Sequence, residues 1–184
     1  MIGFCHLPKT GGTSLVQGMR NAGMNVWVPT PPEGIEPWEV WEWDQSPPEG
    51  TDVVAGHIAA TEFDQFPDVT EWVTVVRHPV VRWVSHLYWI NRNRTGNWNL
   101  PPSNLMGRMY TQGQPNVWKR LELPFVELWH HSNIDQAADW FGIQLPADRH
   151  KATMRPDPIP PDLYAAAVAV NDYDMELWRW INRD

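Results

Sequence analysis

Short apolar runs alternate with helix-like segments along most of the chain. Runs rich in apolar and β-branched residues predict strands at Ile2–Leu7, Met24–Val28, Asp52–Ala55, Glu71–Val76 and Phe125–Leu128. Helices are predicted at Thr13–Ala22 with Thr13 as the cap, at Ala59–Phe66, at Pro79–Arg92, at Ile134–Phe141 and from Pro161 onward. Strands that alternate with helices are typical of an α/β fold with a mostly parallel sheet.

Two stretches lack this alternation. Residues 29–50 are rich in Pro, Trp and Glu and predict a long, acidic, irregular loop. The segment 96–114 is polar and interrupted by proline, and it is left unassigned. No internal repeat is present, and 184 residues suffice for one domain and not for two, so a single domain is expected over residues 1–184.

Composition excludes several function classes. The formal net charge of −8 argues against a nucleic-acid partner, which would call for a basic face. Cys5 is the only cysteine, so an internal disulfide framework and a Cys-rich zinc site are excluded. No apolar run reaches the roughly 18 residues of a membrane span, and a Gly-rich turn interrupts the N-terminal apolar stretch. We therefore expect a soluble, cytoplasmic protein without a membrane partner.

Charge is unevenly distributed. Residues 21–70 hold ten acids and no Lys or Arg, whereas residues 71–120 hold seven Lys or Arg and one acid. A chain that is acidic overall and basic in its middle can hold a local anion site. A solvated surface of uneven charge is the alternative.

The turn after the first predicted strand has the composition of a phosphate site. It reads Pro8-Lys9-Thr10-Gly11-Gly12-Thr13-Ser14. Glycines let backbone N–H groups approach an anion, the helix N-terminus adds partial positive charge, and Lys9 adds a full one. The nucleoside-triphosphatase motif places its Lys after the glycines, whereas here Lys9 precedes them. A strand-to-helix turn without a ligand is the alternative.

A second candidate anion site follows the strand Glu71–Val76. Arg77 stands where this strand ends, and a guanidinium there suits a phosphate. Ser85 follows two helical turns later on a similar face. Arg82 is a third candidate, with a structural ion pair as its alternative. For Arg77 alone, a surface salt bridge is the alternative.

These two segments together resemble the sulfotransferases that use 3′-phosphoadenosine 5′-phosphosulfate (PAPS). The first is similar to their 5′-phosphosulfate loop, P-K-T-G-G-T-S, and the second to their 3′-phosphate motif, R-x-P-x-x-R-x-x-S-x-x-Y. Both are closest to the carbohydrate branch, typified by heparan sulfate 2-O-sulfotransferase. The resemblance covers about a third of the chain and implies a three-layer α/β/α fold of P-loop-like type.

The resemblance also implies roles for individual residues. Lys9 would stabilise the leaving 5′-phosphate, while Thr10, Gly11, Gly12, Thr13 and Ser14 would cradle it. Arg77 and Ser85 would hold the 3′-phosphate, and the product would be adenosine 3′,5′-bisphosphate (PAP), with no metal required. The acceptor would be a hydroxyl group, most simply of a carbohydrate. Lys151 and Arg155 fall where the family places a late loop over the nucleotide.

The acceptor hydroxyl needs a base. His57 follows a predicted strand and is expected at the same sheet edge as Lys9. In the resembling branch a Gly-His pair at this point carries the catalytic base, and Gly56-His57 fits it. Glu62 is a rival base, and packing of His57 under a loop is the non-catalytic alternative.

Two other functions compete with sulfate transfer. One is a PAPS- or PAP-binding module without turnover, and the other is a small P-loop kinase. The position of Lys9 counts against the kinase. Most tryptophans, Trp83 and Trp89 among them, are expected to serve packing.

Overall fold

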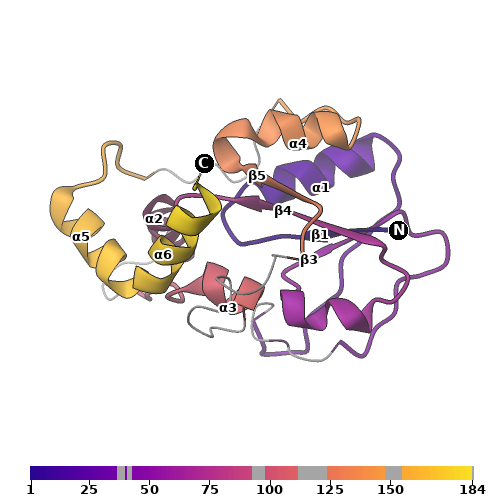
Figure 1. Cartoon of the computed structure of the whole chain (residues 1–184), viewed down its shortest axis with the longest axis horizontal. Helices are drawn as coiled ribbons and strands as arrows, with labels where there is room; N and C mark the ends of the chain where they lie inside the picture. Colours follow the sequence, from indigo (N-terminus) through magenta and orange to yellow (C-terminus); the bar gives the residue numbers. More distant parts are fainter. Residues whose placement is uncertain (37–39, 41–42, 93–97, 112–123, 148–154, 184) are drawn as a thin grey trace.

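The computed structural model describes residues 1–36, 40, 43–92, 98–111, 124–147 and 155–183 (Figure 1). A five-stranded sheet in the order β2-β3-β1-β4-β5 runs through its centre, and every pairing in it is parallel. The strands are β1 (Ile2–Cys5), β2 (Val26–Trp27), β3 (Val53–Gly56), β4 (Glu71–Val76) and β5 (Glu127–His130). All of β3 and all but the first residue of β4 are buried, which explains their almost continuous apolar sequences.

Helices cover both faces of the sheet (Figure 1). The helical elements are α1 (Gly12–Asn21), η2 (Ala60–Gln65), α2 (Pro79–Ile90), α3 (Leu105–Thr111), η4 (His131–Asn133), α4 (Ile134–Trp140), α5 (Pro161–Val170) and α6 (Asp172–Ile181). On one face, α1 and α4 pack Leu15 and Ala137 against Phe4 of β1. On the other face, η2, α3 and α6 pack around Val54 and Trp72. The predicted α/β/α class is thereby confirmed.

A third apolar cluster joins α2 to the C-terminal helices. Val80, Trp83 and Val84 of α2 pack against Ala167 of α5 and Met175 of α6. This cluster fixes the helix that carries the second candidate anion site. Within the described residues, no helix is long and apolar enough to cross a membrane.

Register aligns the ends of the strands at one edge of the sheet. Cys5 of β1 lies opposite Gly56 of β3 and Thr74 of β4, and Val76 of β4 lies opposite His130 of β5. The segments that follow four of the strands therefore emerge side by side. The chain passes from β3 on one side of β1 to β4 on the other, and such switch points are where open α/β sheets bind ligands.

The structure corrects several local predictions. Helix α1 begins at Gly12, and Gly11 is its cap with a left-handed φ of 91°, so Thr13 lies inside the helix and does not cap it. Strand β5 begins two residues later than predicted, because the parallel ladder pairs Glu127 with Val73. The unassigned segment contains the helix α3, Leu105–Thr111.

The acidic loop 29–50 contains no helix or strand among its described residues, as predicted. It is nevertheless fastened to the body of the protein. The Trp43 backbone N–H donates to Gln65, and the Trp43 indole donates to Glu62 at 2.9 Å. Trp38 and Trp41 lie outside the described residues.

Candidate nucleotide site

The turn after β1 has an unusual backbone conformation. Lys9 has a φ of 69°, in the left-handed region that side chains with a Cβ rarely adopt, and Gly11 has a φ of 91°. The left-handed Lys9 costs on the order of 1 kcal/mol or more, a cost that ordinarily clusters at functional sites. The surrounding structure therefore holds the Lys9 backbone in a conformation that is locally unfavourable.

Both glycines of the turn are required by close contacts. A Cβ at Gly12 would lie 2.1 Å from the His6 ring, and a Cβ at Gly11 would lie 2.4 Å from Ile134 and 3.4 Å from the His131 ring. His6 therefore packs beside the turn. Gly12 thus makes room for the His6 ring, and Gly11 makes room for the Ile134 side chain.

The side chains of the turn do not all face outward. The Thr10 hydroxyl is fully buried and donates to the Leu7 carbonyl at 2.7 Å. Ser14 is also buried, and its N–H lies 2.9 Å from the Gly11 carbonyl. Thr13 is half-buried in the first turn of α1. An anion at this turn would therefore meet backbone N–H groups and Lys9 before it met the Thr10 hydroxyl.

Arg77 meets this turn directly. Its Nη1 donates to the backbone carbonyl of Lys9 at 3.0 Å, so the two predicted anion-binding segments adjoin each other. Burial and the nearby positive charge of Arg155 lower the Arg77 pKa to about 10, which leaves Arg77 charged at neutral pH. Arg155 itself lies 3.9 Å from the Asp157 carboxylate, and it adds a second positive charge near Arg77. Lys151 lies outside the described residues.

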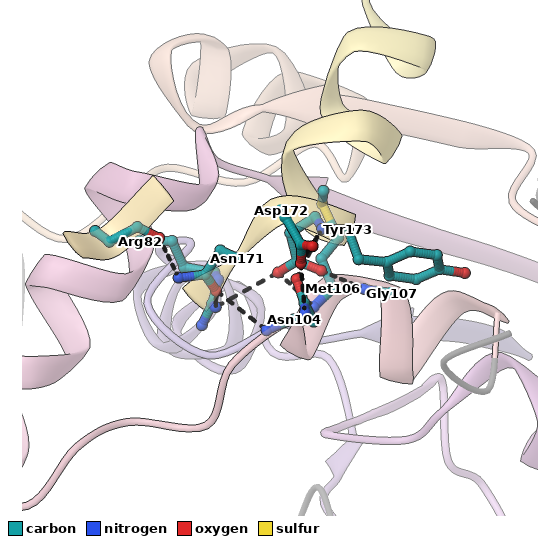
Figure 2. Close-up of polar contacts among 9 residues, drawn as sticks. Arg82, Asn104, Met106, Gly107, Asn171, Asp172 and Tyr173 are labelled. Carbon is teal, nitrogen blue, oxygen red and sulfur yellow. Dashed lines mark hydrogen bonds and ion pairs between the residues drawn. The ribbon is translucent and has the colours of Figure 1, made fainter. Parts of the chain in front are cut away.

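Ser85 and Arg82 both lie in α2, and they have different surroundings. Ser85 is buried two turns after Arg77. Arg82 is fully buried, and its Nη2 lies 3.6 Å from the Asp174 carboxylate and 3.5 Å from the Asn171 side-chain oxygen (Figure 2). Of the two readings open for Arg82, the structural ion pair is the one observed.

The same carboxylate caps a helix. Asp174 accepts the backbone N–H groups of Met106 at 3.1 Å and Gly107 at 2.7 Å, the second and third residues of α3. Asn104 also donates to Asp172 and Asn171, so α2, α3 and α6 meet in one polar cluster (Figure 2). This cluster sets the position of the helix that bears Ser85.

His57 follows β3 and packs on His6, with ring centroids 4.6 Å apart. Its Nδ1 faces the His6 backbone carbonyl. A carbonyl oxygen can only accept, so Nδ1 carries the hydrogen and Nε2 is the basic nitrogen of the neutral ring. His86 lies deeper: burial, followed by the charges of Arg82, Lys9 and His57, lowers its pKa to about 3. His86 is therefore neutral at physiological pH.

Glu62, the rival base, lies inside η2 with only 2% of its surface exposed. One carboxylate oxygen accepts the Trp43 indole and the Ala59 backbone N–H. Burial raises its pKa above the ordinary range. A carboxylate held in this way fastens the acidic loop to η2.

Sequence reasoning missed two residues at this edge. Trp89 was expected to serve packing, but it is half-buried with its ring centroid 5.4 Å from the Lys9 ammonium. Its spacing of four from Ser85 was the available signal, since such residues share a helix face. His131 directly follows β5 and approaches Gly11, and it was missed because the end of β5 was predicted two residues early.

No three His, Cys, Asp or Glu side chains converge on a possible metal position within the described part of the chain. The side chains described at this edge of the sheet are the cations Lys9 and Arg77, the histidine rings and the Trp89 indole. The chemistry of this edge suits an anionic ligand.

Comparison with known proteins adds one similarity. No protein family model matches the chain, and no curated protein matches it. Among solved structures, the chain is similar to a sulfotransferase from Alicyclobacillus acidocaldarius. That alignment covers 96% of this chain and 98% of the other, with 13% identity and a TM-score of 0.44. A likeness of this size assigns neither a family nor a residue, so the function is argued from the site.

Proposed function

We propose that the protein is a sulfotransferase that moves a sulfuryl group from PAPS to an acceptor hydroxyl. The observation that carries the proposal is the hydrogen bond from Arg77 to the Lys9 carbonyl, 3.0 Å long, at the edge where β1 and β4 end. It brings two motifs that are separated in the sequence, each with a cationic side chain, into direct contact. A nucleotide with an anionic group at each end suits such an arrangement.

We assign the 5′-phosphosulfate to the turn after β1. The N-terminus of α1 offers N–H groups and partial positive charge there, and Lys9 adds a full charge. The 3′-phosphate belongs with Arg77 and Ser85, and Arg155 adds charge near Arg77. Thr10 would act through its backbone N–H, because its side chain is buried. Ser14 is also buried and its N–H already donates to the Gly11 carbonyl, so Ser14 would act by shaping the turn that cradles the phosphate.

The proposed reaction is an in-line displacement at sulfur. The acceptor oxygen forms a bond to sulfur while the bond from sulfur to the bridging oxygen of the 5′-phosphate breaks. The acceptor proton passes to Nε2 of His57, and the leaving PAP gains negative charge, which Lys9 and the α1 N-terminus stabilise. His57 suits this role because its Nδ1 hydrogen is directed at the His6 carbonyl, which leaves the lone pair on Nε2.

For the acceptor we propose a chemical class, whereas for the donor we propose a specific compound, PAPS. The likeness of the two motifs to the carbohydrate branch favours a sugar hydroxyl. A carbohydrate hydroxyl is therefore the first acceptor to examine.

The test is transfer of radiolabelled sulfate from PAPS to a panel of mono- and oligosaccharides, with ATP and Mg²⁺ as a parallel donor. Sulfated product formed from PAPS supports the proposal. Binding of PAP without transfer to any acceptor would make the protein a binding module. Phosphoryl transfer from ATP would make it a kinase, and either result overturns the proposal.

A further inference from the structure

We propose that Trp89 is a positioning residue that holds the Lys9 ammonium at the reacting bond. This inference rests on the proposed function, in which Lys9 stabilises the leaving phosphate. It goes beyond the two motifs, neither of which contains Trp89.

The backbone of Lys9 is fixed first. Its carbonyl accepts the hydrogen bond from Arg77, and its φ of 69° is one that few turns allow. A fixed backbone does not fix the ammonium, however, because four rotatable bonds separate it from the Cα. A lysine that must meet charge developing on one oxygen needs a second constraint at its far end.

The Trp89 ring provides that constraint. Its centroid lies 5.4 Å from the Lys9 Nζ, within the range over which an indole face attracts a cation. Trp89 belongs to the last turn of α2, and Arg77 lies two residues before the start of the same helix. Both ends of Lys9 are therefore held by residues at the two ends of α2.

The Trp89 ring also packs beside a buried imidazole. The His86 ring centroid lies 5.8 Å from that of Trp89, and burial, followed by the charges of Arg82, Lys9 and His57, lowers the His86 pKa to about 3. His86 is therefore neutral and adds no charge that would compete with the Lys9 ammonium for the ring.

Arg92 provides a matched control. Its guanidinium carbon lies 4.8 Å from the same ring centroid, and its Nη1 donates to the Trp89 carbonyl at 2.8 Å. Arg92 is exposed and lies outside both anion-binding segments. Arg92→Ala removes one cation from the ring and leaves the other in place.

The experiment replaces Trp89 by tryptophans that carry one, two and three fluorine atoms on the indole. Fluorine weakens the attraction of the ring for a cation and scarcely changes its size, so packing is preserved. We expect kcat for sulfate transfer to fall stepwise along the series, by about 2- to 30-fold in total. KM for PAPS and the affinity for PAP should stay within about twofold, and Arg92→Ala should keep the wild-type kcat.

A second measurement is independent of turnover. The Lys9 side-chain methylene protons should show upfield ring-current shifts in NMR spectra, and Trp89→Leu should abolish them. An unchanged kcat along the fluorine series, or a fall matched by equal losses of PAP affinity and thermal stability, would overturn the inference. If the wild-type protein neither binds PAP nor transfers sulfate, the proposed function itself has failed, and the NMR shifts then report only on the contact.

Discussion

The guanidinium of Arg77 donates a hydrogen bond to the backbone carbonyl of Lys9, with 3.0 Å between Nη1 and the oxygen. These residues lie 68 positions apart in the sequence, and each follows a strand of the same parallel sheet. Arg77 therefore has two roles. Its hydrogen bond stabilises the conformation of the Lys9 turn, and its guanidinium adds positive charge beside that turn.

Replacing Arg77 should therefore weaken nucleotide binding strongly. Arg77→Ala removes a hydrogen bond to a charged group, worth about 1.5–3 kcal/mol, so PAP affinity should fall by about 10- to 100-fold. Arg77→Lys restores charge without the planar fork and should recover only part of the loss. Isothermal calorimetry measures both.

The matched control for net charge is Arg20→Ala. Arg20 lies in the last turn of α1, at the opposite end of that helix from the Lys9 turn, and it is exposed. Its removal should leave PAP affinity within about twofold of the wild type. Equal PAP affinities for the wild type and Arg77→Ala would show that Arg77 does not contribute to nucleotide binding.

Replacing His57 should separate catalysis from binding. His57→Asn offers a side-chain N–H toward the His6 carbonyl but has no basic nitrogen, so the local contact can persist while proton transfer cannot. We expect kcat to fall by about 10²–10⁴-fold with PAP affinity unchanged. Wild-type kcat in His57→Asn would end the assignment of this base.

Glu62 should affect stability more than turnover. Its folded-state pKa is raised by burial, so between the unfolded and folded pKa values the native state binds more protons and loses stability as the pH rises. Glu62→Gln removes that loss, so at pH 8 it should raise the melting temperature of the protein. The gain should shrink on acidification in thermal melts. A large fall in kcat in this variant would instead restore Glu62 as the base.

The cluster around Arg82 should behave as one unit (Figure 2). Arg82→Met leaves the Asp174 carboxylate buried without its ion pair, which should cost about 3–5 kcal/mol. Asp174→Asn weakens the same pair and the cap of α3. The double variant should lose less than the sum of the single losses, as urea unfolding would show. Strict additivity would mean that the two side chains act independently.

Much of the fold could be predicted from the sequence because buried parallel strands have distinctive apolar runs. The runs at β1, β3 and β4 were located to within about two residues, and the α/β class with a parallel sheet followed from their alternation with helices. The three-layer arrangement was implied by the resemblance to the sulfotransferases. Helix α3 was not predicted, because its seven residues are stabilised by the distant Asp174 carboxylate. The residues next to α3 in the sequence do not indicate a cap that comes from a distant side chain.

The candidate-site residues that directly follow strands could be predicted from the sequence. Lys9, His57 and Arg77 each stand just after a strand, and a parallel sheet brings such positions to one edge. The contact of Trp89 with Lys9 was not predictable in this way, because it depends on the conformation of the long lysine side chain. The inward orientation of Thr10 was hidden for a similar reason, since its partner is the Leu7 carbonyl.

The central claim is that one nucleotide with charge at both ends spans the Lys9 turn and Arg77. Calorimetric titration with PAP, beside adenosine 5′-monophosphate and adenosine 3′-monophosphate, tests it most directly. The account predicts that PAP binds much more tightly than either monophosphate, that Lys9→Ala chiefly removes the benefit of the 5′-phosphate, and that Arg77→Ala chiefly removes that of the 3′-phosphate. Equal binding of all three nucleotides, or no binding of PAP at all, would contradict it.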